Sequence, residues 1–543
     1  MNTIKKHLNQ LVLLLVLTPY FVTAQYQFTW SDYKVQETNK YIFNDVIFFR
    51  DSLYLSYQDQ SSFRLARKMP FFRLEKRNKS FEVVDAKNVK IEASGVEIRM
   101  IDFFKLNDKL FFMGESYEKN TQNKFVICEF DPDNLVPGET RFEFVSEDLS
   151  REVFLYNREL NYFIINDPRI ENNSNKDLLL FATKELTTDR KKLNIRFLMF
   201  ENDMQLAFER EVKLELNNYD FFIKQMEFDA KGNLYVSGIE GPPQSHRTLP
   251  YRPKSKNVKG HLWHFHLNNE NYVHKEIAFD DEDNFVHGNK FFRDLKIFPM
   301  DKRVNVFGLY ATSPFNKREW RQPSEGVFYV EFDSDLENQS ETVFNPIEEE
   351  ILHYNKTPWL KNKLNSEGKR VGFPGLKIEE VIYDKQYGFF VIAEASFISY
   401  LNYGNNSYGK NYSSNELVVF RFGKDGQIIW QNYIPKIKQS AKRTNSHPTY
   451  LMRLDKNHLD IYFSGSMELL EEKKQSKSEE GFLLAKFNFE DGKRVIKPLD
   501  TELPPKFNIL FYPGDEISRN TFFIMAKKTY WGSKFGFFEI ISN

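Results

Sequence analysis

His264 and His266, in the segment HLWHFHL, are the side chains whose spacing best suits a metal site. If this segment is a β-strand, residues two apart share one face, so the two imidazoles lie side by side. A zinc-type site needs at least one more protein ligand. The sequence identifies no third ligand, so we expect a packed or surface pair and treat both histidines as weak metal candidates.

Two acidic segments could hold calcium through hard oxygen ligands. The run from Asp280 to Asp283 matches no defined calcium loop. Asp131 is followed by Pro-Asp-Asn and lacks the glycine that an EF-hand needs for its sharp turn. Both segments are therefore predicted to be solvated turns, and we expect no cofactor, with calcium as the alternative.

Local catalytic motifs are absent from the sequence. There is no phosphate-binding Gly-Lys-Ser/Thr loop, no cysteine pair for zinc and no G-x-S-x-G elbow. Cys128, the single cysteine, lies in the apolar run FVICEF and is predicted to be a small buried hydrophobe. Because an enzyme with dispersed residues would show no such motif, catalysis stays open, although a non-enzymatic role is favoured.

Long segments rich in Tyr, Trp, Arg and Asn are the second group with binding chemistry. They span residues 241–260, 311–325, 399–415 and 467–480. The candidate contact residues are Arg247, Tyr251, Arg252, Arg318, Trp320, Arg321, Tyr400, Tyr403, Tyr408 and Tyr412. Tyr, Trp and Arg dominate protein interfaces, and Tyr/Asn/Ser/Gly mixtures are adaptable. A protein partner, a glycan and plain solvated decoration are the three interpretations.

The elements that carry these segments follow a repeated pattern. Residues 221–279 contain four short apolar or alternating runs separated by turn residues, which predicts a four-stranded antiparallel meander. The run after the first turn recurs eight times, at 52–57, 109–115, 177–183, 233–238, 304–310, 388–394, 459–465 and 521–527. Such a repeat predicts an all-β propeller of four-stranded blades, with eight blades favoured and seven as the alternative.

Three further expectations concern the closure of the ring, a helical segment that interrupts the β pattern, and the placement of the long segments. The last unit lacks a strand, so residues 26–30 are predicted to complete it and close the ring. Asn345, Pro346 and the following Ile-Glu predict the start of a short helix that ends near Tyr354, in a connector around 345–366. The long segments all join second to third strands, so they emerge at one end of the propeller, where binding is expected.

The start and the charge of the chain bear on its compartment. Lys5 and Lys6, the apolar run 11–17 and Val-Thr-Ala before Gln25 predict a signal peptide over residues 1–24. The later sequence has no run long enough for a membrane span. The 543 residues carry a net charge of −1, which gives no global attraction to nucleic acid. We expect a periplasmic or outer-membrane-associated protein, with an extracellular location as the alternative.

At FDAKGNLYVSG and FRFGKDGQIIWQNYIPK the sequence resembles repeat-type β-propellers of secreted and periplasmic proteins from gram-negative bacteria, with WD40- or PQQ-like blade repeats. The resemblance implies the propeller fold and no single activity. Because the chain ends inside the last repeat, we expect an envelope component and no secretion cargo, and a plug-type subunit of the type 9 translocon is one candidate. The favoured function is a scaffold for an envelope protein or complex, and the alternative is a carbohydrate-binding or carbohydrate-active propeller.

Overall fold

The computed structural model describes most strands and the tight turns between them. The described residues are 25–31, 41–59, 72–93, 96–106, 108–116, 123–146, 161–165, 178–186, 192–200, 204–215, 221–229, 233–240, 259–266, 271–277, 290–312, 323–354, 372–402, 408–434, 436, 439–441, 450–466, 480–501, 507–518, 521–528 and 533–541.

Eight antiparallel sheets of four or five strands make up most of the described chain. The first four sheets are β2 to β5 (Tyr41–Phe49, Ser52–Asp59, Phe72–Arg77, Val83–Val89), β6 to β10 (Ile91–Ala93, Val96–Leu106, Lys109–Ser116, Asn123–Asp131, Val136–Ser146), β11 to β14 (Asn161–Ile165, Leu178–Leu186, Lys192–Phe200, Leu206–Glu215) and β15 to β18 (Phe221–Phe228, Leu234–Glu240, Lys259–Phe265, Tyr272–Ile277).

The next three sheets are β19, β20, β22 and β23 (Phe291–Met300, Arg303–Ala311, Gly326–Asp333, Val343–Pro346), β25 to β28 (Leu376–Asp384, Gly388–Asn402, Tyr408–Phe422, Ile428–Ile434) with β29 (Gln439–Ala441), and β30 to β33 (Tyr450–Asp455, His458–Ser466, Glu480–Asn488, Arg494–Leu499). The last sheet joins β34 to β36 (Phe507–Ser518, Thr521–Lys528, Ser533–Ile541) to β1 (Gln25–Trp30). A separate pair is β21 (Pro323–Ser324) with β24 (Phe373–Pro374).

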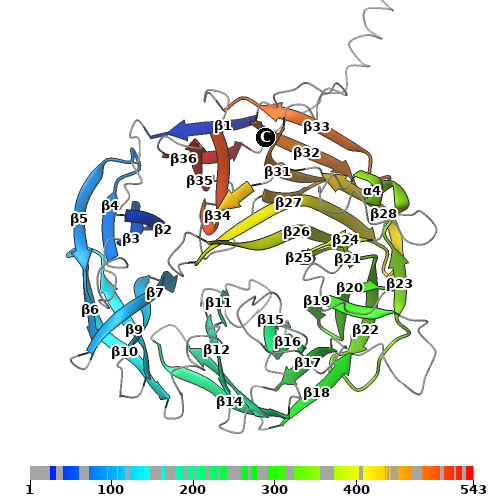
Figure 1. Cartoon of the computed structure of the whole chain (residues 1–543), viewed down its shortest axis with the longest axis horizontal. Helices are drawn as coiled ribbons and strands as arrows, with labels where there is room; N and C mark the ends of the chain where they lie inside the picture. The colour runs from blue at the N-terminus through cyan, green and yellow to red at the C-terminus, as the bar shows by residue number, and fades with distance from the viewer. Residues whose placement is uncertain are drawn as a thin grey trace, which may run out of the picture.

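Strand order within the sheets agrees with the repeat seen in the sequence. If the short β6 and the added β1 are left aside, each of the eight recurring runs forms the second strand of a meander, namely β3, β8, β12, β16, β20, β26, β31 and β35. Figure 1 shows the sheets standing one after another around a ring. The prediction of four-stranded antiparallel sheets in a propeller-like arrangement is confirmed at this level.

Apolar side chains fill the spaces between neighbouring sheets. Phe307 and Tyr329 of one sheet pack with Phe389 and Phe422 of the next, and all four side chains are buried. A meander has two faces and cannot bury both alone, so each sheet depends on its neighbours for its core. Aromatic rings, which make up 16% of the residues, supply these contacts between sheets.

The N-terminal strand lies on the C-terminal one. β1 pairs with β36 along its whole length, from Gln25 opposite Ile541 to Trp30 opposite Gly536. Phe28 is buried in the cluster between this sheet and β30–β33, and the Trp30 indole donates a hydrogen bond to the Thr501 carbonyl at 2.8 Å. The last sheet therefore combines one strand from the N-terminal end of the described chain with three strands from its C-terminal end.

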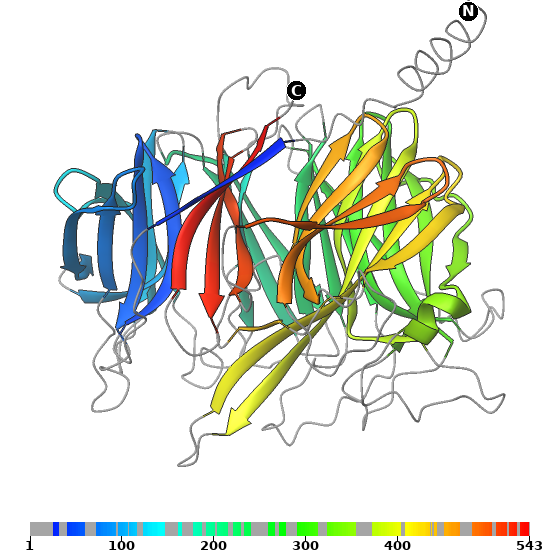
Figure 2. The ribbon, with the colours of Figure 1, turned by 90° about the horizontal axis from the view of Figure 1, so that it is seen from above.

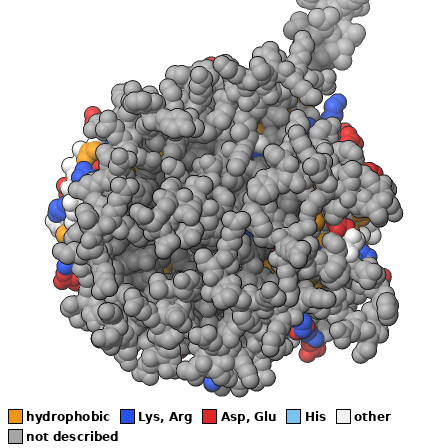
Figure 3. Space-filling model, viewed as in Figure 1, with side chains coloured by type: hydrophobic (Ala, Val, Ile, Leu, Met, Phe, Trp, Pro, Cys, Tyr) orange, Lys and Arg blue, Asp and Glu red, His pale blue; other side chains and the backbone are white. Residues whose placement is uncertain are grey.

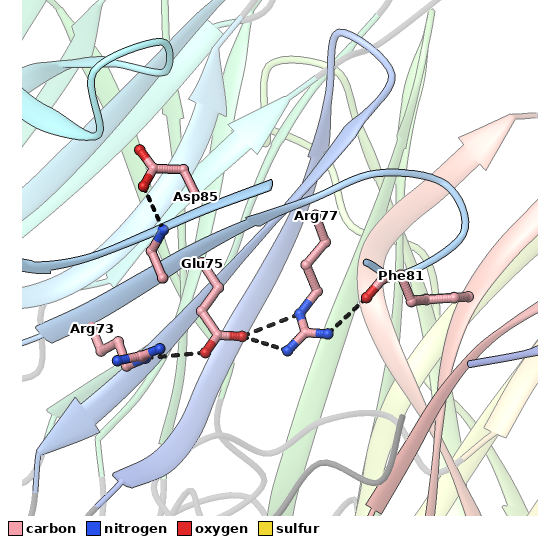
Figure 4. A network of polar contacts seen from close by, with 6 residues as sticks. Arg73, Glu75, Arg77, Phe81 and Asp85 are labelled. Carbon is pink, nitrogen blue, oxygen red and sulfur yellow. Dashed lines mark hydrogen bonds and ion pairs between the residues drawn. The ribbon is translucent and has the colours of Figure 1, made fainter. Parts of the chain in front are cut away.

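A polar network shapes the contact between the last sheet and the sheet β2–β5 (Figure 4). Glu75 accepts hydrogen bonds from Arg73 at 3.0 Å and from Arg77 at 2.6 Å, and Arg77 also donates to the Phe81 carbonyl at 2.7 Å. Phe81 has a positive φ of 64°, and its ring stacks on Phe537 of β36 at 4.7 Å. The ionic network thus holds a strained turn that presents an aromatic ring to the last sheet.

The connector after β23 differs from the prediction at its start. The helix α4 runs over Glu349–Tyr354, and Ile347 and Ile351 are buried as the pattern indicated. Asn345 is no helix cap; it lies in β23, where its side chain donates to the Gly426 carbonyl and accepts from the Ile428 amide. The asparagine joins two sheets instead, so the helix begins later. Residues 355–371 lie outside the described residues.

The tight turns that join the third and fourth strands of two sheets have the conformation that the sequence predicts. Gly426 and Gly492 of the two Asp-Gly pairs have φ values of 77° and 67°, as turns of this kind require. At Gly426 a Cβ atom would lie 2.0 Å from the Tyr329 ring of the neighbouring sheet. This glycine is needed both for its backbone conformation and for close packing.

Candidate functional site

The segment 399–415 was expected to be irregular, but its described residues, 399–402 and 408–415, lie in two paired strands, so the prediction was wrong for them. β26 and β27 each run for 15 residues, and they stay paired from Ser396 opposite Ser414 to Asn402 opposite Tyr408. The run FISYLN has strong strand propensity, which outweighed the Asn and Gly residues that indicated a loop. Figure 2 shows this hairpin projecting beyond the body of the sheets.

The arm (residues 396–402 and 408–414, with β29) carries part of the predicted contact set. Tyr400 lies opposite Lys410, Tyr408 opposite Asn402, and Tyr412 opposite Ile398 on β26 and Ala441 on β29. The other predicted contact residues, Arg247, Tyr251, Arg252, Arg318, Trp320, Arg321 and Tyr403, lie outside the described residues. The structure thus brings three of the ten together in one element.

Buried charges occupy the base of the arm. Lys436 forms an ion pair with Glu394, and the exposed fractions of these side chains are 0% and 7%. The Lys436 ammonium also lies 5.6 Å from the centre of the buried Tyr450 ring. Burial lowers the pKa of Lys436, while the carboxylate of Glu394 acts in the opposite direction. A β-bulge after Glu394 marks the point where β26 leaves its sheet and enters the arm.

Glu416 lies on β27, near the ion pair of Lys436 and Glu394. Its residue is 7% exposed, and its Oε2 atom has no hydrogen-bond partner among the described residues. Burial raises the pKa of this carboxyl to about 7, against the attraction of Lys436. Glu416 therefore exchanges a proton near neutral pH, which is the behaviour that acid–base groups need.

We expect Glu416 to make stability depend on pH. Because its pKa rises from 4.5 to about 7 on folding, the folded protein holds a proton that the unfolded chain has released, so stability falls as pH rises through this window. The slope approaches at most about 1.4 kcal/mol per pH unit. Glu416→Gln should remove it when urea unfolding is compared at about pH 5 and pH 7.5. Equal slopes in this variant, the parent and the exposed control Glu139→Gln would contradict the assignment.

Further buried charged side chains lie on the first strands of neighbouring sheets. Lys224 on β15 forms an ion pair with Asp294 on β19 at 2.7 Å, and the other oxygen of Asp294 accepts the Ile378 amide of β25 at 3.0 Å. Gln225 bonds the backbone of Ile297 in the same manner, through both its oxygen and its nitrogen. These first strands are thereby tied to one another by side chains.

A recurrent bulge places these side chains. The pairing of first and second strands shifts by one residue just before Asp45, Asp102, Gln225, Asp294 and Glu380. A bulge re-aims the side chains around it. In β25 the two residues at the bulge, Glu379 and Glu380, are exposed. We call Lys224, Asp294, Glu394, Glu416 and Lys436 the inner charged cluster.

The remaining sequence candidates divide between packing, turns and undescribed segments. Cys128 is 1% exposed, and burial raises the pKa of its thiol, in keeping with the predicted buried hydrophobe. Asp131 accepts hydrogen bonds from the Asp133 and Asn134 amides, as a turn residue does. The run from Asp280 to Asp283 and residues 1–24 lie outside the described residues.

His264 and His266 do share one side, as the strand periodicity indicated, with ring centres 4.1 Å apart. His264 lies in β17, one residue before its end, and is 0% exposed.

The described side chains visible around the rim in Figure 3 mix Lys and Arg with Asp and Glu, in accord with the near-zero net charge. None of the helices in the described part of the chain has the length and hydropathy of a membrane crossing.

Comparisons with known proteins add little to this description. No protein-family model matches the chain, and no curated protein matches it. Among solved structures, the WD40 domain of SCAP from fission yeast aligns over 96% of this chain and 98% of its own, with 8% identity and a TM-score of 0.35. A mutant apocarotenoid oxygenase from Synechocystis aligns over 89% and 92%, with 9% identity and a TM-score of 0.34. At such scores neither likeness carries weight for fold or function.

The sheets themselves define the class. Antiparallel meanders that follow one another around a ring, each packed on its neighbours, make this a propeller-like all-β protein.

Proposed function

We propose that this protein is an eight-bladed, closed propeller that acts as a non-enzymatic scaffold in the bacterial cell envelope and binds a protein partner through the end that carries the arm. The eight sheets would be the blades, and the pairing of β1 with β36 would close the ring. Phe81 of the first sheet and Met525 of the last belong to one buried hydrophobic cluster, which supports closure. The signal-like residues 1–24 support export to the periplasm or outer membrane.

The arm is the observation that carries the proposal. It extends beyond the sheet in which it begins, and its two strands stay paired with each other as far as Asn402 and Tyr408. In the described chain no strand pairs with the free edge of β26 beyond Ala395. A free strand edge with Tyr-rich flanks suits the addition of an extended segment from another protein.

Co-purification from the native envelope tests this function. A variant with Trp320, Arg321, Tyr403 and Tyr408 replaced by alanine is expected to lose its partner, since truncated interface anchors each cost about 2 kcal/mol or more. Replacing the exposed Glu337, Lys456 and Lys493, in turns at the other end of the sheets, is the matched control and should leave recovery unchanged. Equal yield of the same proteins with both variants would exclude the arm end as the binding surface.

A carbohydrate-binding or carbohydrate-active propeller is the second candidate, because Glu379 and Glu380 expose carboxylates near the inner charged cluster. Although both side chains reach solvent, the protein around them desolvates their carboxyl groups and raises the pKa of each, as a glycosidase acid requires. An oligosaccharide that binds the parent, and not a Glu379→Gln, Glu380→Gln double variant, would favour this candidate over the scaffold.

A further inference from the structure

His264 is a buried imidazole with unmet hydrogen-bonding capacity. It is 0% exposed, and neither ring nitrogen has a hydrogen-bond partner among the described residues. A buried polar group left in this state costs free energy and calls for a physical explanation. A neutral imidazole keeps a lone pair on one of its ring nitrogens, so a ring without a hydrogen-bond partner has an atom to offer a metal ion.

Two more ligand side chains lie against this ring. His266 is half-buried, and Asp335 reaches over from the turn between β22 and β23 of the neighbouring sheet. One ligand atom from each of the three residues lies within 4.8 Å of the other two. The sequence could not disclose Asp335 as the third ligand, because it is about 70 residues away and comes close only when the two sheets pack together.

The turn that holds Asp335 is well fixed. The Asp333 carboxylate accepts the amides of Glu337 and Asn338, and Leu336 is fully buried. The Ser334 carbonyl accepts a hydrogen bond of 2.7 Å from the Tyr235 hydroxyl. Asp335 thus sits between two anchored residues, and its carboxylate does not depend on a mobile loop.

Tyr235 connects the turn to the histidine. Its ring stacks on His264 at 4.4 Å with an angle of 9°, while its hydroxyl bonds the backbone next to Asp335. The stacked ring and the hydrogen bond hold His264 and the turn of Asp335 in a fixed position relative to each other. One residue here positions ligands from both sheets.

We propose that His264, His266 and Asp335 bind a divalent transition metal of the zinc type and so link two neighbouring sheets. Two imidazoles and one carboxylate suit zinc, whereas calcium and magnesium prefer oxygen ligands throughout. Metal–ligand bonds of about 2.0–2.2 Å place tetrahedral ligand atoms about 3.3 Å apart, a contraction within reach of small side-chain rotations. The exposed carboxylate leaves the fourth position to water, at the end of the sheets opposite the arm.

Titration calorimetry with zinc chloride, on tag-free protein first treated with a chelator, tests the site. We expect one zinc ion per chain, and a higher thermal unfolding temperature when zinc is present. His266→Ala and Asp335→Asn should each weaken zinc binding by at least about tenfold. Cobalt should report the same site through its visible absorption, which the two substitutions should abolish.

Two control variants separate this site from unspecific binding. Glu337→Gln removes an exposed carboxylate from the same turn. His274→Gln disrupts the other histidine pair, in which Nδ1 of His261 lies 3.0 Å from Nε2 of His274. Both controls should bind zinc like the parent. The proposal is overturned if the parent binds no zinc, if His266→Ala and Asp335→Asn bind it unchanged, or if His274→Gln loses it. Circular dichroism of the metal-free variants checks that each is folded.

Discussion

Phe28→Ala is expected to lower the free energy of unfolding by about 3–5 kcal/mol, the range found when buried phenylalanine is truncated to alanine. The Phe28 ring lies 5.0 Å from Phe538 and 5.8 Å from Phe482, and it stacks on Trp30 at 5.9 Å. These partners come from both ends of the chain and from the preceding sheet. The substitution therefore weakens the packing that holds β1 in the last sheet.

Gln27→Ala is the matched control for this prediction. Gln27 precedes Phe28 in β1 and is exposed, so its truncation should change stability by no more than about 0.5 kcal/mol. Both variants keep the backbone pairing of β1 with β36, so the difference measures the buried ring. Chemical unfolding of the two proteins should separate them clearly. If Phe28→Ala unfolds at the same denaturant concentration as Gln27→Ala, β1 does not pack as described.

The second large effect is expected at Asp294, where replacement by alanine should cost about 3–5 kcal/mol. The Asp294 side chain is 5% exposed and satisfies both the Lys224 ammonium and the Ile378 amide. Its loss leaves a charge and a backbone donor without their partner between three sheets. Denaturant unfolding of the variant measures this cost directly.

A double-mutant cycle distinguishes a paired charge from a merely well-packed side chain. Lys224→Met removes the charge that Asp294 neutralises, so Lys224→Met with Asp294→Ala should be less destabilised than the sum of the single variants. The difference should amount to about 1–3 kcal/mol. Strict additivity would mean that the ion pair contributes nothing, and that the stability loss comes from the Ile378 hydrogen bond alone.

The sheets could be predicted because their signals are local. Alternating runs such as LYVSG after a Gly-Asn turn, and Asp-Gly pairs that need positive φ, specify strands and turns without reference to distant residues. The repeat of these signals then fixes the order of strands within each sheet. Where two local signals conflicted, the prediction failed. Asn345 and Pro346 resembled a helix start, but Asn345 bonds the turn of the next sheet.

The candidate sites depend on contacts between residues far apart in the sequence, so the sequence could not disclose them. Glu394 and Lys436 pair across 42 positions, and Asp335 meets His264 only across a sheet boundary. One usable signal was present. Polar residues recur at the same place in successive first strands, as Gln225 and Asp294 do, and an alignment of the repeats on their bulges would have marked them as equivalent.

The most direct test of the scaffold function is photo-crosslinking in the native envelope. A photoreactive amino acid replaces Tyr408 in the arm, and in a second protein it replaces Lys456, which is exposed in the turn between β30 and β31 at the other end of the sheets. The proposed function predicts a discrete crosslinked protein from position 408 and none from position 456. No adduct at position 408, or the same adducts from both positions, would contradict partner binding through the arm.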